Sequence, residues 1–158
     1  METITYEKLT KIQKELLDEA EKVMENSYNP YSHFFVGAAL LTKNDKIITG
    51  TNVENAAYGS TICAERAAIL RANAMGYNVY KAIAIIARGQ DFDTKEVSGP
   101  CGSCRQMLYE SSQVSERNLE VIISTTKKNK IIISSIEELL PFAFGPKDLR
   151  IDVKKYQK

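Results

Sequence analysis

The sequence predicts a single α/β domain over residues 1–158, in which helices cover a β-sheet. Two observations lead to this fold class. Segments with the apolar spacing of helices alternate with short apolar runs typical of buried strands, as in a sheet packed against helices. A chain of this length makes about one domain, since domains run to roughly 100–200 residues, and it can bury a sizeable core without disulfide bonds. We find no internal repeat, linker or second domain.

The N-terminal half of the chain is expected to form two helices with two strands between them. The apolar residues of the first segment fall on one helical face, and Asn29-Pro30 ends that segment. A Lys-Asn-Asp turn separates the two strands. Thr61 is the candidate N-cap of the second helix, and Gly76 ends it. The four elements are a helix over 5–25, strands over 34–41 and 46–50, and a helix over about 62–75.

The C-terminal half is expected to contribute three further strands and two helices. Pro100 opens the longer helix, because a proline suits a first turn, where its missing N–H has no partner in any case. A turn-rich segment from Pro141 to Pro146 follows the last element. The elements are a buried strand over 80–88, a helix over about 101–113, strands over 119–126 and 130–134, and a short helix near 136–140.

Composition and charge exclude several classes of protein. Twenty-one basic and 20 acidic residues leave a net charge of +1, so we expect neither a nucleic-acid nor a membrane partner. The longest apolar run, from Phe34 to Leu41, is much shorter than the roughly 20 residues of a membrane helix, and the first residues lack the apolar core of a signal peptide. Three cysteines are too few, and odd in number, for a disulfide framework. We therefore expect a cytoplasmic protein with reduced thiols.

The three cysteines are the candidate metal ligands. Cys63 lies at the predicted start of one helix, and Cys101 and Cys104 lie at the start of another, where their i, i+3 spacing places them on one face. A catalytic zinc site typically has three protein ligands and keeps one position for water, and thiolates favour zinc over magnesium or calcium. The alternatives are a redox pair and three small buried apolar residues. A non-enzymatic zinc or redox module would need a fourth ligand or a reducible pair.

Several segments together resemble one enzyme family. Cys63-Ala64-Glu65, followed by Pro100-Cys101-Gly102-Ser103-Cys104-Arg105-Gln106, is similar to the signature of the zinc nucleoside deaminases. Three more segments, at 31–40, 52–56 and 139–146, resemble the small cytidine deaminases that assemble as homotetramers. The similarity extends from about Pro30 to Leu149, and Gly99 and Ser103 depart from residues common in that family.

The resemblance implies a fold, an activity and a cofactor. The expected fold is a three-layer α/β/α domain with a mixed sheet of about five strands. The expected activity is the hydrolytic, zinc-dependent deamination of cytidine and 2′-deoxycytidine to the uridines, with release of ammonia, in pyrimidine salvage. The expected state is a homotetramer with one Zn²⁺ per chain and active sites shared between subunits. A related deaminase acting on a nucleotide, on a base in RNA or on an aminoglycosyl-type cytosine antibiotic is the nearest alternative.

Two residues next to Cys63 have expected roles in the chemistry. Glu65 is two residues further along the helix, about 200° around its axis, so it is not a zinc ligand. It can instead take a proton from the attacking water, pass it to the ring nitrogen and later protonate the leaving amine. Three thiolates leave a zinc site with one net negative charge, which helix N-termini and a nearby cation can offset. Arg66 is three residues from Cys63, on the same face, and the resemblance implies that it donates hydrogen bonds to the thiolates.

The expected substrate-binding residues come mainly from the resemblance. Asn52 and Glu54 face the same way in an extended chain and are implied to hold ribose hydroxyls. Phe34 is implied to pack on the base, Ala64 to contribute to substrate binding, and Phe144 to reach the pocket of an adjacent chain. The alternatives are a plain loop at 52–55, a core strand residue at Phe34, and a Phe144 that caps its own core. The only histidine, at position 33, is interpreted as non-catalytic.

Overall fold

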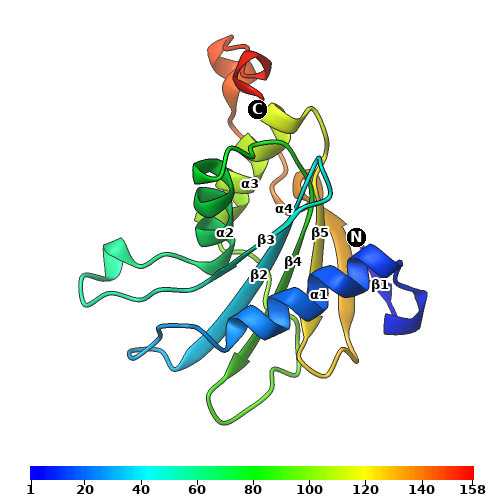
Figure 1. Cartoon of the computed structure of the whole chain (residues 1–158), viewed down its shortest axis with the longest axis vertical. Helices are drawn as coiled ribbons and strands as arrows, with labels where there is room; N and C mark the ends of the chain where they lie inside the picture. The colour runs from blue at the N-terminus through cyan, green and yellow to red at the C-terminus, as the bar shows by residue number, and fades with distance from the viewer.

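The middle layer of the structure is one mixed β-sheet with the strand order β1-β6-β5-β4-β2-β3 (Figure 1). The structure is a computed structural model and describes residues 1–158. Strands β4 and β5 run parallel, and every other neighbouring pair is antiparallel. The strands are β1 Glu2–Ile4, β2 Phe34–Thr42, β3 Ile47–Thr51, β4 Tyr80–Gly89, β5 Glu120–Thr125 and β6 Ile131–Ser135.

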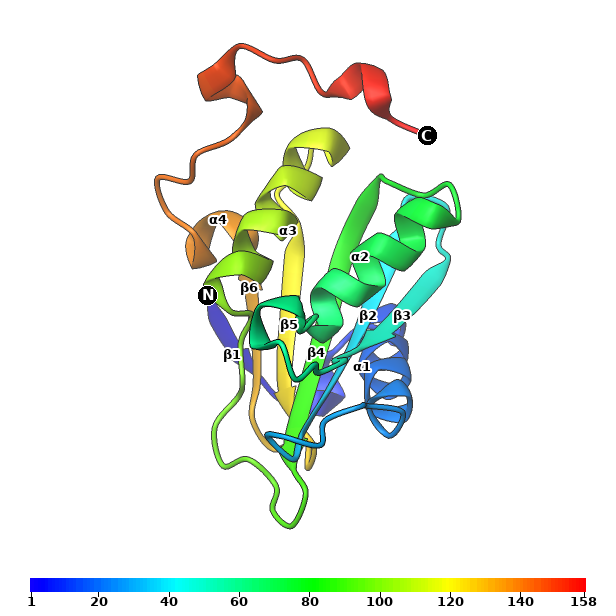
Figure 2. The ribbon, with the colours of Figure 1, turned by 90° about the vertical axis from the view of Figure 1, so that its left-hand side faces the viewer.

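Helices cover both faces of this sheet, so the predicted three-layer α/β/α fold is confirmed (Figure 2). Helix α1 packs on one face against β2 and β4, and α2 and α3 lie side by side on the other face. None of the helices is long and apolar enough to cross a membrane. Their bounds are α1 Lys11–Met24, α2 Ala64–Ala74, α3 Gly102–Ser115 and α4 Ile136–Leu139.

The sheet divides the apolar core into two clusters, and β4 contributes to both. Ile86 belongs to the cluster between the sheet and α1. Ile83 and Ile85 belong to the cluster beneath α2 and α3. Successive side chains of a strand point to opposite faces, so a strand covered on both faces is apolar along its whole length. This confirms the prediction of a buried strand over 80–88.

The first helix is shorter than the periodicity over 5–25 predicts. Residues Tyr6–Lys8 form a 3₁₀ turn, and α1 begins at Lys11. The Gln13 N–H donates to Thr10 Oγ1 at 3.4 Å, and the Thr10 N–H donates to Gln13 Oε1 at 2.9 Å. This reciprocal capping box satisfies two N–H groups that a helix start leaves without partners, and it therefore fixes where α1 begins.

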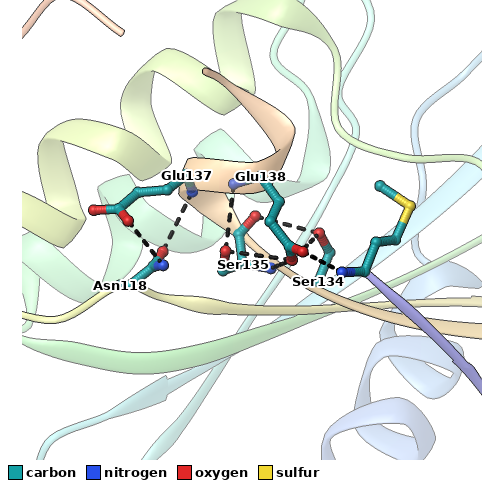
Figure 3. Close-up of polar contacts among 6 residues, drawn as sticks. Asn118, Ser134, Ser135, Glu137 and Glu138 are labelled. Atoms are coloured by element: carbon teal, nitrogen blue, oxygen red, sulfur yellow. Dashed lines mark hydrogen bonds and ion pairs between the residues drawn. The ribbon is translucent and has the colours of Figure 1, made fainter. Parts of the chain in front are cut away.

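The sheet has six strands where about five were expected, and β1 is the addition. Glu2–Ile4 pairs antiparallel with β6, with Ile4 opposite Ile131. The Met1 amino group pairs with Glu138, whose carboxylate also accepts the Ser135 N–H at 2.9 Å at the start of α4 (Figure 3). The amino group and these hydrogen bonds lower the pKa of Glu138 to about 2. A three-residue strand is too short to show an alternating pattern, so the sequence gives no sign of it.

Two glycines within strands let helices approach the sheet closely. A Cβ atom on Gly37 in β2 would lie 1.9 Å from the Ala20 carbonyl oxygen of α1. A Cβ atom on Gly50 in β3 would lie 2.3 Å from the Ala68 nitrogen and 2.6 Å from the Ala64 oxygen of α2. Both positions therefore exclude any side chain, and Gly50 sets how deeply the first turn of α2 lies against the sheet.

Candidate metal centre and active site

The three cysteine sulfurs gather where α2 and α3 begin. Cys63 is the N-cap of α2, Cys101 is the N-cap of α3, and Cys104 lies in the first turn of α3. The expected N-cap, Thr61, is two residues too early. Its hydroxyl instead accepts the Asn55 N–H at 3.1 Å, because the chain stays extended up to Cys63. The single cysteine of α2 and the cysteine pair of α3 thus meet at the positive ends of the two helices.

The spacing of the sulfurs fits a zinc ion. All three Sγ atoms lie within 4.8 Å of one another. The Cys63–Cys101 distance is 3.8 Å, and the Cys101–Cys104 distance is 3.5 Å. A tetrahedral zinc ion with Zn–S bonds of about 2.3 Å separates its sulfurs by about 3.8 Å. Three thiols at this spacing, with no fourth His, Cys, Asp or Glu in the cluster, are the donor set of an open zinc site.

The surroundings of the cluster favour a thiolate at Cys63. A hydrogen bond from Cys104, and then the Arg66 guanidinium, lower the pKa of Cys63 to about 5, while the same contact raises the pKa of Cys104. Arg66 Nη2 lies 3.8 Å from Cys63 Sγ and donates to the Thr61 carbonyl at 2.8 Å. Its Nε is buried with no hydrogen-bond partner. The guanidinium is therefore placed to offset negative charge on the sulfurs, as its spacing from Cys63 predicts.

Glu65 is a buried carboxyl beside the sulfurs and is not part of their cluster. Its side chain is 4% exposed and lines the same pocket as Cys63 and Cys101. Burial, and to a lesser extent the charge of Cys63, raises the pKa of Glu65 above its ordinary value. A carboxyl with a raised pKa in a pocket can both accept and return a proton, which is what a general acid–base requires.

A pocket of about 440 Å³ opens above this carboxyl. That volume lies within the range of pockets for small molecules, roughly 300–1,000 Å³. Its wall includes six of the site residues predicted from the sequence: Phe34, Asn52, Glu54, Cys63, Glu65 and Cys101. Cys104 and Ala64 are fully buried beside it, and Arg66 lies behind the sulfurs. Exposed His33 is not part of the wall.

Asn52 and Glu54 face the pocket and also form hydrogen bonds with the backbone of the adjacent segment, residues 31–36 of the same chain. Asn52 Nδ2 donates to the Phe34 carbonyl at 2.9 Å, and Oδ1 accepts the Val36 N–H at 2.9 Å. Glu54 Oε2 accepts the Tyr31 N–H at 2.9 Å. A carboxamide nitrogen has two N–H bonds and a carboxylate about four acceptor positions, so each side chain retains capacity for a ligand.

Phe34 and Phe144 lie in different settings. Phe34 is the first residue of β2, paired with Gly89, and is half-buried in the pocket wall. Phe144 is 61% exposed and lies outside the pocket, with its carbonyl accepting a hydrogen bond from Gln106 Nε2 at 2.8 Å. Phe34 is therefore both a strand residue and a pocket residue, and the alternative that Phe144 caps its own core is wrong.

Sequence reasoning missed several wall residues. Ile85 reaches the pocket from the middle of β4, and Ser98 reaches it from the loop before α3. Ser32 and Thr61 line both this pocket and an adjoining cavity of about 350 Å³. Ser32 belongs to a segment that the resemblance covers, which is the one signal that could have found it. The others depend on which face of the sheet the helices cover, and spacing along the chain does not show this.

Residues 10–118 match the model of a family described as the cytidine and deoxycytidylate deaminase zinc-binding region, and the chain belongs to this family. It is 40% identical to a cytidine deaminase of Sporosarcina psychrophila, over 86% of this chain and 93% of that protein. It is 41% identical to a probable cytidine deaminase of Dictyostelium discoideum, over 84% of each chain. The crystal structure of a cytidine deaminase from Burkholderia pseudomallei superposes with a TM-score of 0.74 and 39% identity, over 86% of this chain and 100% of that chain.

Proposed function

We propose that this chain is a zinc-dependent cytidine deaminase, which hydrolyses cytidine and 2′-deoxycytidine to the uridines and releases ammonia for pyrimidine salvage. The observation that carries the proposal is that the buried Glu65 carboxyl lines the same pocket as Cys63 and Cys101, two members of the three-sulfur cluster. The names of relatives at about 40% identity support the same activity. A site of three reduced thiols suits the reducing cytoplasm.

The residues of the pocket divide the work of the reaction. Zinc held by Cys63, Cys101 and Cys104 would supply a Lewis acid that makes water nucleophilic at neutral pH. The Glu65 carboxylate removes a proton from the attacking water and delivers it to N3 of the cytosine ring while C4 is attacked. It then carries the proton of the new C4 hydroxyl to the amino group, so that the C4–N bond breaks, ammonia leaves and C4 becomes a carbonyl. Arg66 and the two helix N-termini stabilise the sulfurs in their charged form.

The wall of the pocket favours an unphosphorylated nucleoside. Phe34 offers an aromatic face to the base, and Asn52 and Glu54 offer a donor and an acceptor to the sugar hydroxyls. The negative charge of Glu54 repels a phosphate group, so a nucleotide is the poorer substrate.

Ammonia release from cytidine tests the proposed function. The zinc-loaded protein should release one ammonia per uridine formed, lose this activity on chelation of the metal and regain it with added zinc. Deoxycytidine monophosphate and free cytosine, assayed in parallel, separate a nucleoside deaminase from a nucleotide or base deaminase. A zinc-loaded protein that released no ammonia from cytidine or 2′-deoxycytidine would overturn the proposal.

Removing the sugar contacts should lower kcat/KM for nucleosides more than kcat/KM for the free base. Asn52→Ala and Glu54→Ala are expected to lower kcat/KM for cytidine by about 10–100-fold, the effect of losing a hydrogen bond to a charged or buried group. Free cytosine has no ribose, so its kcat/KM should change much less. The measured quantity is the ratio of the two kcat/KM values. An equal loss on both substrates would mean that these residues support only the fold. The melting temperatures of the variants show whether they remain folded.

We further propose a homotetramer whose sites are shared through Phe144. Exposed Phe144 lies on a turn-rich segment, and large exposed aromatic residues commonly mark contacts. Glu65→Ala and Phe144→Ala chains should each be nearly inactive. After joint unfolding and reassembly with zinc, activity should rise well above the sum of the separate variants, because some sites then combine Glu65 of one chain with Phe144 of another.

Two controls make the mixing experiment decisive. Phe142→Ala removes a neighbouring phenylalanine that is fully exposed, and it should be active without mixing. Sizing chromatography should first show that the Phe144→Ala chains are still tetrameric. If every site is built from one chain, no mixed assembly gains activity.

A further inference from the structure

A tight turn before β2 lies against the segment that follows β3. The Tyr28 N–H donates to the Asn52 carbonyl at 3.1 Å, and the Glu54 N–H donates to the Tyr28 carbonyl at 2.8 Å. The chain then turns back, with the His33 N–H bonded to the Asn29 carbonyl at 3.0 Å and His33 in the left-handed region at φ 52°. The two segments thus run side by side along the pocket.

The Glu54 carboxylate is held under this turn by three donors. Its Oε2 accepts the Tyr31 N–H at 2.9 Å and the Ser32 N–H at 3.2 Å, and its Oε1 accepts the Ser32 hydroxyl. Partial desolvation opposes ionisation of this carboxyl, but the hydrogen bonds from Ser32 and Tyr31 outweigh it and lower the pKa of Glu54. The group is therefore charged, and one of its roughly four acceptor positions remains open.

The hydroxyl of Ser32 also fixes the start of β2. While it donates to Glu54, it accepts the Phe34 N–H at 3.1 Å. Ser32, Phe34 and Glu54 all line the 440 Å³ pocket. One hydroxyl thus connects the backbone of Phe34, the residue proposed to contact the base, with the carboxylate proposed to bind the sugar.

We propose that Ser32 is a positioning residue for the nucleoside, whose hydroxyl fixes the Glu54 carboxylate and the Phe34 backbone at the separation that one base-plus-sugar ligand requires. This inference rests on the proposed function of the pocket. A glutamate side chain that is free to rotate loses conformational entropy when it binds a ligand, and a carboxylate fixed in advance avoids that loss. Ser32 should therefore contribute to nucleoside binding through Glu54.

The test compares Ser32→Ala with Ser32→Thr, which keeps the hydroxyl, and with Ser60→Ala, an exposed serine outside the pocket. Ser32→Ala should raise KM for cytidine about tenfold, the effect of losing one hydrogen bond, with kcat changed much less. Ser32→Thr should restore most of the loss, and Ser60→Ala should behave like the wild type. Zinc content and melting temperature should be unchanged in all three variants.

A double-mutant cycle with Glu54→Ala separates positioning from a general loss of structure. If Ser32 acts through Glu54, then Ser32→Ala should add little to the defect of Glu54→Ala. Additive defects, or an equal loss on cytidine and cytosine, would overturn the proposal.

Product binding keeps this test independent of turnover. Calorimetry should show that Ser32→Ala lowers the affinity for uridine and leaves the affinity for uracil unchanged. A chain that binds uridine in this way without deaminating cytidine would refute the proposed function and support the role of Ser32. Equal uridine affinity in the wild type and in Ser32→Ala would refute the role of Ser32 alone.

Discussion

Replacing Glu65 with glutamine should reduce the turnover of cytidine by at least 10²–10⁴-fold, the typical contribution of a general acid–base. Glutamine keeps the shape of this buried side chain but cannot carry a proton between water, ring nitrogen and leaving amine. Because Glu65 is not part of the sulfur cluster, the variant should retain about one zinc per chain. Steady-state ammonia release and metal analysis of the same preparation measure the two effects.

A matched control for this variant is Glu110→Gln, which neutralises an exposed carboxylate on α3 away from the pocket. It should retain the wild-type rate. Near-normal turnover in Glu65→Gln would show that another group moves the protons. A large loss of zinc would instead show that Glu65 holds the metal site together.

Replacing Cys104 with alanine should lower zinc occupancy and the melting temperature together. Cys104 is fully buried and its Sγ lies 3.5 Å from that of Cys101. Zinc bound by cysteine-rich sites contributes about 10–16 kcal/mol in small peptides, and this binding free energy stabilises the folded state. Loss of one of three protein ligands should therefore leave substoichiometric metal and a less stable chain.

Ser103→Ala is the control for Cys104→Ala, because this exposed neighbour lies outside the sulfur cluster and the pocket. Its zinc content and melting curve should match those of the wild type. Full zinc with an unchanged melting curve in Cys104→Ala would exclude Cys104 as a ligand. A redox pair would instead give wild-type protein with a disulfide and little metal, which thiol titration under denaturing conditions detects.

The sequence predicts the Cys101–Cys104 pair of the metal cluster well because its geometry is local. A C-x-x-C pair at a helix start brings Cys101 and Cys104 together whatever the rest of the fold does. The meeting of this pair with Cys63, 38 residues earlier, is not local; the resemblance to the zinc nucleoside deaminases implies it, and the structure places all three sulfurs within 4.8 Å of one another. The roles of these residues in catalysis remain predictions that the experiments above address.

Element boundaries and the pocket wall were harder to predict because they depend on tertiary packing. Thr61 is a better N-cap by residue type than Cys63, yet α2 begins after Cys63. Ile85 becomes a wall residue because it lies on the sheet face beneath α2 and α3. The position of Phe144 relative to another chain is a property of the assembly, and one chain alone does not determine it.

The absence of a side chain at Gly50 has a consequence for the geometry of the metal site. A Cβ atom there would lie 2.3 Å from the Ala68 nitrogen, whereas ordinary contact begins near 3.4 Å, so α2 would have to rise by roughly 1 Å. Metal–ligand distances tolerate deviations of only about 0.2 Å. Cys63 moves with α2 and the other two cysteines belong to α3, so such a shift would open the triangle of sulfurs on one side. Gly50, which lies in β3, thus helps to set the distance between the sulfur of Cys63 and the sulfurs of Cys101 and Cys104.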